Sequence, residues 1–144
     1  MIAFDTNVLV YAANEDSEFH DACRRSLDDA RDDPSPAFLT WGVCYEFLQV
    51  VTHSRAQPVA WNPTEAWAFL TGLLESPGFS LLTPTTRHTA VLGRTLAEVP
   101  NIRGLRMHDL HTAVLMREHG ISRICTRDRD FRLFPFLDVV DPLA

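Results

Sequence analysis

Four acidic motifs lie far apart in this chain of 144 residues, and each stands at the edge of an apolar segment. Their carboxylates are Asp5, Glu46, Asp109 and the pair Asp128 and Asp130. The first directly follows the apolar run from Met1 to Phe4, which predicts a buried strand that ends at a carboxylate. The carboxyl ends of strands are where α/β folds place their ligand-binding groups. The motifs therefore predict an acidic site at such an edge.

Carboxylates that meet in one site repel one another. At a separation of about 4 Å and an effective dielectric near 20, each pair costs roughly 4 kcal/mol. That is a large part of the stability of an ordinary domain, which is about 5–15 kcal/mol. A compensating cation is therefore expected if three of the acids converge. Oxygen ligands suit Mg²⁺ or Mn²⁺, and sites of this kind commonly handle phosphate.

Length and composition predict a single domain over residues 1–144, because 46% of the residues are hydrophobic and the chain is short for two domains. No basic leader precedes the first strand and no apolar run is long enough for a bilayer, so a cytoplasmic protein without membrane association is expected. Cys23, Cys44 and Cys125 are odd in number and have apolar neighbours. They are predicted to be reduced core thiols.

Charge argues against broad electrostatic capture of nucleic acid, because the net charge is −6. Positive charge is nevertheless concentrated between Arg103 and Arg132, beside the last acidic motifs. All 13 basic residues are arginines. A guanidinium can bind phosphate in a bidentate fork, although a compositional bias of the genome would also explain the missing lysines.

Hydrophobic spacing and turn residues predict strands that alternate with helices. The expected strands lie near residues 1–5, 38–40, 79–82, 123–126 and 137–140, and the expected helices near 8–11, 19–30, 41–52, 62–75, 85–99 and 106–119. Thr6 or Asn7 is expected to cap the first helix. Glu46 falls inside the third helix, with Val43, Phe47 and Val50 as its buried stripe. The alternation predicts an α/β sandwich with a parallel sheet.

Taken together, these motifs resemble the PIN-domain family, and within it the VapC-type toxin ribonucleases of type II toxin–antitoxin pairs. The resemblance spans nearly the whole chain. It rests on Asp5-Thr6-Asn7, on Glu46 in the third helical region, on Asp109 near the start of a helix that ends in Glu118-His119-Gly120, and on Thr126 to Phe131 after a strand. It implies a three-layer α/β/α sandwich with a central, mostly parallel sheet.

The resemblance also implies a metal-dependent endoribonuclease, in which Asp5, Glu46, Asp109 and Asp128 line one pocket and hold one or two divalent ions, Mg²⁺ or Mn²⁺. On this reading Asp5 bridges two ions, Asp109 and Asp128 bind one, and Glu46 mainly binds the other. Two ions about 3.5–4 Å apart would stabilise the attacking and the leaving oxygen of a phosphodiester together. In-line attack by water would leave a 5′-phosphate and a 3′-hydroxyl.

The last motif departs from the commonest family pattern, in which the Asp-Phe pair lies one position further on. Both Asp128 and Asp130 are acidic, so either can be the direct ligand; Asp128 is favoured and Asp130 is kept as the alternate or outer ligand. Thr6, Asn7 and Thr126 would donate hydrogen bonds that orient the carboxylates. For the first two, helix capping is an equally good explanation.

Several other polar residues are weaker candidates. His108 can contact substrate phosphate, whereas His111 lies two residues from Asp109 and is expected to point away from the pocket. Arg127 and Arg129 can face RNA or pair with the acidic first quarter of the chain. Among the tryptophans, Trp61 is expected to be the exposed one.

The expected partners follow from the resemblance: an RNA substrate such as a transfer or ribosomal RNA loop, a small antitoxin protein, and a second copy of the chain in a homodimer. Two alternatives stay open. One is another metal-dependent phosphodiesterase or phosphatase, although the phosphatase pattern needs a second Asp two residues after Asp5, where Asn7 stands. The other is a PIN-like module that binds RNA or protein without turnover, although none of the four acids is lost.

Overall fold

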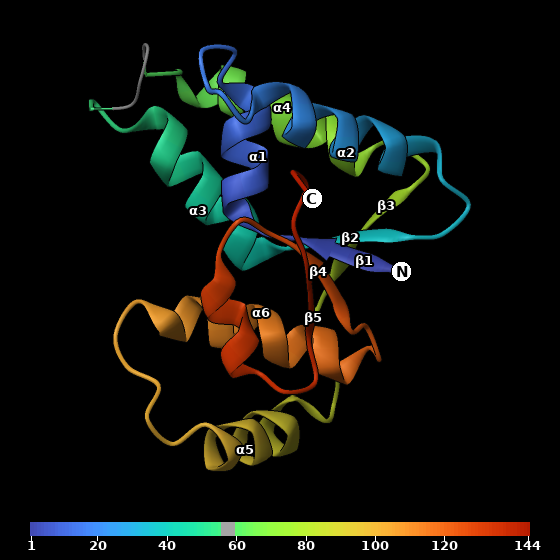
Figure 1. Cartoon of the computed structure of the whole chain (residues 1–144), viewed down its shortest axis with the longest axis vertical. Coiled ribbons are helices and arrows are strands. Elements are labelled where there is room, and N and C mark those ends of the chain that lie inside the picture. Colours follow the sequence, from blue (N-terminus) through green and yellow to red (C-terminus); the bar gives the residue numbers. More distant parts are fainter. Residues whose placement is uncertain (56–59) are drawn as a thin grey trace.

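The computed structural model describes residues 1–55 and 60–144, and in this part of the chain five strands form one sheet (Figure 1). The strands are β1 (Ile2–Phe4), β2 (Ala37–Thr40), β3 (Phe79–Leu82), β4 (Arg123–Cys125) and β5 (Asp138–Val140). The helices are α1 (Thr6–Ala13), α2 (His20–Asp32), α3 (Trp41–Thr52), α4 (Pro63–Leu74), α5 (His88–Glu98), α6 (Arg106–Glu118) and the short 3₁₀ helix η1 (Arg129–Leu133).

The sheet order is β3-β2-β1-β4-β5, and every described pairing is parallel. Strand β1 is therefore central, with Ile2 opposite Ala37 of β2 and Ala3 opposite Ile124 of β4. Strands in a parallel sheet are covered by helices on both faces, which explains why these strands are short apolar runs. The predicted α/β class with a parallel sheet is confirmed.

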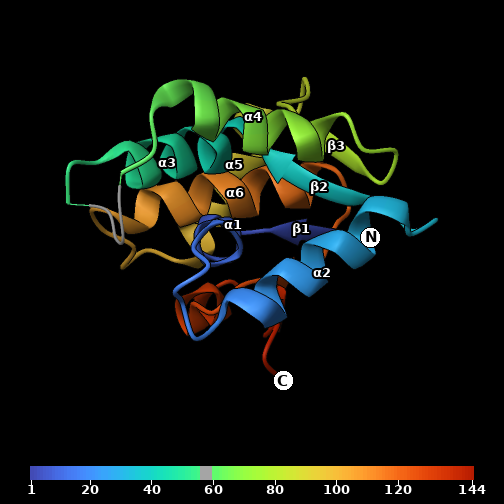
Figure 2. The ribbon, with the colours of Figure 1, turned by 90° about the horizontal axis from the view of Figure 1, so that it is seen from above.

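Helices cover both faces of the sheet, so the molecule has three layers (Figures 1 and 2). Adjacent residues of β1 point to opposite faces, as the pleat of a strand requires. Phe4 packs into the core beneath α1 to α4, which also contains Leu39, whereas Ala3 packs into the core beneath α5 and α6, which also contains Ile124. The predicted α/β/α sandwich is confirmed.

Most element boundaries follow the sequence signals. Asn62 caps α4 by accepting a hydrogen bond from the amide of Glu65, with Pro63 at the first helical position. Gly120 follows α6 with φ +70°, a left-handed conformation that glycine commonly adopts where a helix ends. Cys23, Cys44 and Cys125 are buried and free, as predicted. None of the helices in the described ranges is long and apolar enough to cross a membrane.

Three local predictions are wrong. Asp5, rather than Thr6 or Asn7, caps α1, because its carboxylate accepts from the amide of Thr6. Val50 is 40% exposed and the next residue, Val51, is buried instead, because α3 turns its Val50 side toward solvent. Trp61 is partly buried: it stacks edge-on against Phe47 and Phe69, whereas the exposed tryptophans are Trp41 and Trp67.

Candidate active site

Asp5 and Thr126 meet because they extend two neighbouring strands in register. Phe4 pairs with Cys125 across β1 and β4, so the next residue of each strand lies alongside the other. The amide of Asp5 donates to the carbonyl of Cys125 at 3.0 Å, and the Thr126 hydroxyl donates to Asp5 Oδ2 at 2.8 Å. The parallel register therefore places Asp5 at the carboxyl edge of the sheet. The residue is only 7% exposed there.

The Thr126 hydroxyl joins three of the motif residues. It accepts hydrogen bonds from Asn7 Nδ2 at 3.0 Å and from the amide of Asp128 at 2.9 Å. Asn7 in turn donates to Asp5 Oδ2 at 3.1 Å and accepts from the amide of Arg127 at 3.1 Å. These bonds fix the loop after β4 against the start of α1. The predicted orienting role of Thr126 and Asn7 is thus supported by their contacts.

The other two acids come from helices on opposite faces of the sheet. Glu46 lies in the second turn of α3, where Glu46 Oε2 accepts a hydrogen bond from the Thr6 hydroxyl at 3.1 Å. Asp109 lies in the first turn of α6 with its side chain 20% exposed. Together with Asp5 and Asp128 they line a pocket of about 230 Å³. The structure thus brings together the four carboxylates that the sequence predicted.

Burial and mutual repulsion perturb two of these acids. Burial raises the pKa of Asp5 to about 6, with a further rise from Glu46 and Asp128, against hydrogen bonds from Thr126 and Thr6 that lower it. Burial, together with the charges of Asp5, Asp128 and Glu46, raises the pKa of Asp109 to about 7. The pocket therefore resists holding all of its negative charge at neutral pH. A cation would relieve that cost.

The donor set of the pocket fits a hard cation, because its four acidic lining residues all supply carboxylate oxygens. In residues 1–55 and 60–144, no three His, Cys, Asp or Glu side chains are already grouped closely enough to form a metal centre. The same acids nonetheless influence one another's pKa values through their charges. The four carboxylates are therefore near enough to influence one another's charge without already forming a closed metal centre.

Asp128 and Asp130 have different surroundings. Asp128 lines the pocket, and its Oδ1 caps η1 by accepting from the amide of Asp130 at 2.9 Å. Asp130 is exposed and forms an ion pair with Arg106, whose other amino group lies 3.8 Å from Asp109. The position of Asp130 outside the pocket favours Asp128 as the direct ligand.

The two candidate arginines also differ. Arg127 Nη1 pairs with Asp141 Oδ2 at 2.8 Å, and its guanidinium lies over the ring of Phe19, 4.5 Å from the centroid. Its pairing partner is thus in the last residues of the chain and not in the acidic first quarter. Arg129 is exposed at the start of η1. Arg129 is thus the more exposed of the two, since the side chain of Arg127 is 29% exposed.

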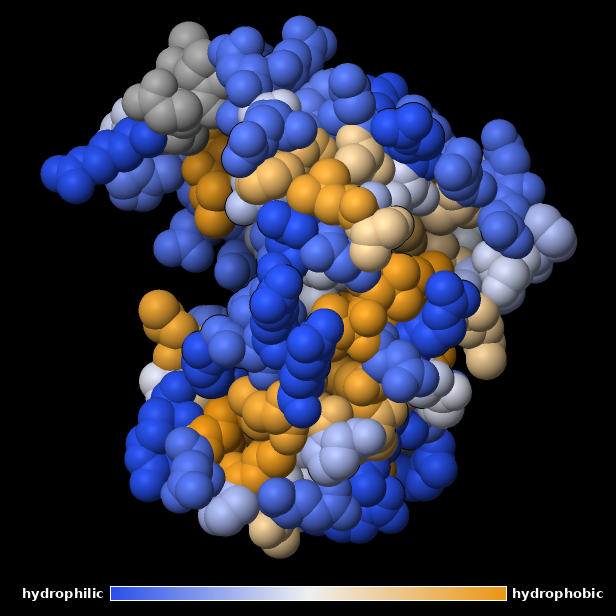
Figure 3. All heavy atoms as spheres, viewed as in Figure 1, coloured by the Kyte–Doolittle hydropathy of each residue, from blue (hydrophilic) through white to orange (hydrophobic). Residues whose placement is uncertain are grey.

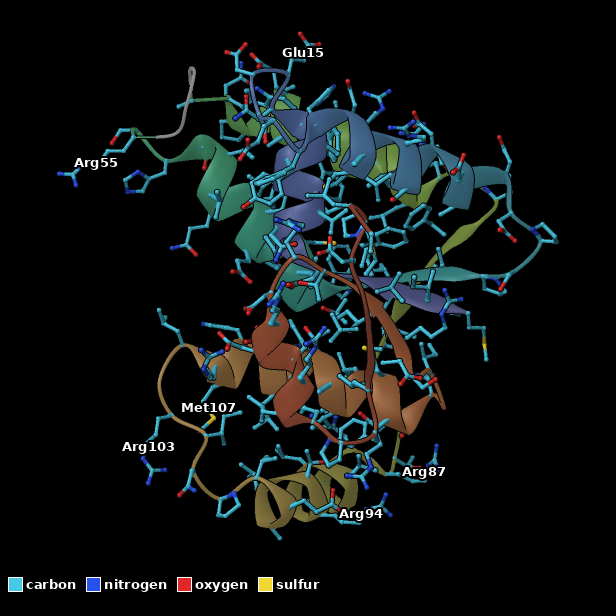
Figure 4. The ribbon with its side chains drawn as sticks, in the orientation of Figure 1. Glu15, Arg55, Arg87, Arg94, Arg103 and Met107 are labelled. Carbon is cyan, nitrogen blue, oxygen red and sulfur yellow. The ribbon has the colours of Figure 1, made fainter. Side chains whose placement is uncertain are left out.

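A larger hollow of about 820 Å³ adjoins the pocket and shares Glu46 and Val50 with it. It lies between the outer face of α3 and the segment that leads into α6, and opens at the left edge of Figure 3. Its lining includes His108 together with the exposed side chains of Tyr45 and Leu105. Arg55 at the end of α3 points away from the body of the molecule (Figure 4).

Sequence reasoning missed two features near these acids. Tyr11 lines the pocket from α1, one turn after Asn7, so helical spacing from the first motif could have found it. The second is a buried carboxylate at the other end of α6. Glu118 accepts hydrogen bonds from the Thr85 amide and hydroxyl at 2.9 and 2.7 Å and lies 2.6 Å from His88 Nδ1. No local pattern marks that cluster, because Glu118 lies 33 residues from Thr85 and 30 from His88.

Comparisons with known proteins agree with this geometry. The chain matches the PIN domain over residues 2–137. Ribonuclease VapC48 of Mycobacterium tuberculosis is 31% identical over 141 residues, which cover 98% of this chain and 97% of VapC48. The chain therefore belongs to the PIN-domain family and, within it, to the VapC ribonucleases.

Solved structures show the same fold at lower identity. VapBC2 from Rickettsia felis, bound to a DNA fragment from its promoter, has a TM-score of 0.67 at 20% identity and covers 97% of this chain and 98% of its own. VapC20 of Mycobacterium tuberculosis, described as a toxin that cleaves the sarcin-ricin loop, has a TM-score of 0.63 at 16% identity, with 92% and 93% covered.

Proposed function

We propose that this protein is a metal-dependent endoribonuclease that acts as the toxin of a toxin–antitoxin pair. One observation carries the proposal: Asp5, Glu46, Asp109 and Asp128, which come from four separate segments, line one pocket at the carboxyl edge of the sheet. The chain's relatives are named VapC ribonucleases, which supports the RNA-cleaving activity.

Asp5, Glu46, Asp109 and Asp128 would hold one or two Mg²⁺ or Mn²⁺ ions, with Asp130 outside them. When bound, such an ion supplies positive charge that stabilises the charge developing on phosphate during hydrolysis. The protein's own groups prepare the carboxylates for this. Thr126 and Asn7 hold Asp5 Oδ2, the Thr6 amide holds Oδ1, and the Thr6 hydroxyl holds Glu46. Such bonds orient ligands and reduce the reorganisation that binding requires. The products would carry a 5′-phosphate and a 3′-hydroxyl.

The substrate that we propose is a single-stranded loop of a structured RNA, either transfer or ribosomal. VapC20, which cleaves the sarcin-ricin loop, supports this class of target by its likeness in fold. Loops offer unstacked bases that side chains can reach, unlike the narrow major groove of an RNA helix. His108 and Arg129 are exposed beside the pocket, where they can contact backbone phosphate. Arg127 pairs with Asp141 in this structure and would have to exchange that partner for an RNA phosphate.

We also propose a protein antitoxin and a second copy of this chain as partners. The VapBC2 structure supports the first by its similarity. The second rests on three large apolar side chains that are exposed on α3 and just before α6: Trp41 at 42%, Tyr45 at 70% and Leu105 at 86%. Exposed apolar side chains that gather in one region are typical of interfaces. Light scattering of the wild type and of Leu105→Ser will show whether a dimer forms through them.

Cleavage of total cellular RNA by the purified, antitoxin-free protein tests the enzymatic proposal. Discrete fragments are expected with Mg²⁺ or Mn²⁺, and they should vanish with EDTA and in Asp5→Asn. End-group labelling should find 5′-phosphates. Retained metal-dependent cleavage in both Asp5→Asn and Asp109→Asn contradicts the assignment of the site. Folded wild-type protein that binds RNA and never cuts it would favour a binding module instead.

A further inference from the structure

His111 occupies the contact between the two helices that carry Glu46 and Asp109. A methyl group built on Gly42, in the first turn of α3, would lie 2.8 Å from His111 Nδ1 and 3.2 Å from its Cε1. Such distances are shorter than van der Waals contact, so the glycine is needed for the ring to fit. The imidazole therefore lies directly against the backbone of α3.

The ring of His111 also lies beside a side chain of a third helix, α5. The ring of His88, in the first turn of α5, lies edge-on to it with centroids 6.5 Å apart and planes at 70°. Glu118 holds His88 by the 2.6 Å contact to Nδ1, and its own carboxylate is buried and bonded to Thr85. Arg87, labelled in Figure 4, also donates to the carbonyl of Glu118. Rotation of His111 away from α3 is therefore restricted.

The consequence concerns the acidic pocket. Glu46 lies one helical turn after Gly42 on α3, and Asp109 lies two residues before His111 on α6. His111 does not line the pocket, as the sequence predicted, because two residues along a helix turn the side chain to another face. The His111 ring is therefore placed where it can set the distance between α3 and α6 without contacting Glu46 or Asp109.

We propose that His111 is a positioning residue: its imidazole, held between Gly42 and His88, sets the spacing of α3 and α6 and thereby the separation of the Glu46 and Asp109 carboxylates. The inference rests on the proposed metal-dependent function for its purpose, but its geometric claim can be measured without metal or RNA. Replacing groups that orient metal ligands commonly lowers metal affinity by about 10–100-fold.

Four variants test it: His111→Ala, His111→Phe, Gly42→Ala, and the double variant of His111→Ala with Gly42→Ala. His111→Ala should weaken Mn²⁺ binding by about tenfold, whereas His111→Phe, which keeps a ring at this position, should retain most of the wild-type affinity. Gly42→Ala should also weaken binding because its methyl group meets the ring. The double variant should bind better than either single variant, because the methyl group then fills the vacated space. His119→Ala, at the exposed residue that caps the C-terminus of α6, is the control and should bind as the wild type does.

Isothermal titration with Mn²⁺ measures these affinities, and circular dichroism verifies that each variant is folded. RNA affinity should stay near that of the wild type while the cleavage rate falls. Losses that simply add in the double variant overturn the inference. The second measurement is the crystal structure of metal-free His111→Ala beside the metal-free wild type. An unchanged separation of Glu46 and Asp109 overturns the spacing claim whatever the wild type does to RNA. Absence of Mn²⁺ binding by the wild type, with a changed separation, would instead contradict the proposed function alone.

Discussion

Asp109 and Glu118 lie at the two ends of helix α6, and their surroundings are opposite. Asp109 faces three other carboxylates, and burial together with their charges raises its pKa to about 7. Glu118 is more deeply buried, which alone would raise its pKa, but hydrogen bonds from His88 and Thr85 lower it instead. Burial by itself therefore does not explain why the two pKa values shift in opposite directions. The neighbouring groups explain it: other carboxylates surround Asp109, whereas hydrogen-bond donors contact Glu118.

The difference shows how one helix serves stability and function at once. A buried carboxylate that is met by donors holds two elements together, as Glu118 joins α6 to the connection between β3 and α5. A carboxylate that is met by other carboxylates weakens the fold until a cation arrives. Removing a charge from the acidic pocket around Asp109 should therefore stabilise the metal-free fold, whereas removing the charge of Glu118 should destabilise it. Four experiments test this contrast and the assignment of the pocket.

The largest effect is expected in the acidic pocket itself. Asp5→Asn should lower the rate of RNA cleavage by at least about 10³-fold, because an ion is worth several kcal/mol of charge stabilisation in such a reaction. Its melting temperature without metal should be unchanged or higher, since repulsion falls and Asn can still cap α1. Single-turnover cleavage and thermal unfolding measure the two quantities. Asp29→Asn, exposed on α2, is the control and should change neither. A clear loss of stability in Asp5→Asn would contradict the claim that the acidic pocket destabilises the metal-free fold.

Stability without metal should depend on pH through the same acids. The pKa of Asp5 rises from 3.8 to about 6 and that of Asp109 from 3.8 to about 7, so the folded protein binds protons more tightly than the unfolded chain. Their contribution is fully present below pH 3.8 and is lost as the pH rises through 6 to 7. For Asp5 alone the difference is on the order of 3 kcal/mol.

Urea unfolding in EDTA between pH 5 and pH 8 measures this dependence, and Asp109→Asn should flatten it. Adding Mg²⁺ should stabilise the protein more at pH 8 than at pH 5. For Glu118 the sign is reversed: its folded pKa lies below 4.5, so its contribution is present above that pH and is lost only in stronger acid. A wild-type curve as flat as that of Asp109→Asn argues against repulsion in the pocket.

Glu118→Ala should destabilise the fold by about 1–3 kcal/mol, because it leaves the partly buried donors of Thr85 and His88 without an acceptor. Glu98 on α5, exposed and paired with Arg117, provides the comparison, and its replacement should have a smaller effect. Urea denaturation gives both values. Equal effects of the two replacements would show that the buried cluster is no more important than a surface ion pair.

The smallest effect is expected for Asp130→Asn. Asp130 is exposed and paired with Arg106 outside the pocket, so cleavage should fall by no more than about threefold, as for the loss of a surface ion pair. Asp128→Asn should resemble Asp5→Asn instead, because Asp128 lines the pocket. Parallel cleavage assays separate the two assignments. The reverse order of effects would make Asp130 the direct ligand.

Local signals in the sequence predicted the fold class and marked the acidic motifs, and the resemblance to the PIN-domain family implied that four of their acids share one pocket. Apolar runs ended at Asp5 and Thr126, and helical spacing placed Glu46 and Asp109 on helices. Strand order was beyond such signals, because pairing of β1 with β4 joins residues more than 100 positions apart. Local signals also left Asp130 as an alternative to the favoured Asp128, since the positions of both depend on the turn into η1. The Glu118 cluster and the contact of His111 with Gly42 needed three-dimensional packing.

Because β1 pairs with β4, the order of synthesis determines when the acidic pocket can form. Asp5 is synthesised 121 residues before the Thr126 whose hydroxyl holds it. At about 5–20 residues per second, synthesis of that interval takes roughly 6–24 s. Throughout it, the nascent chain lacks β4, the Thr126 hydroxyl and Asp128. The acidic pocket therefore cannot be assembled until Asp128 has been synthesised, and a growing chain carries Asp5 while still incapable of cutting RNA through that pocket.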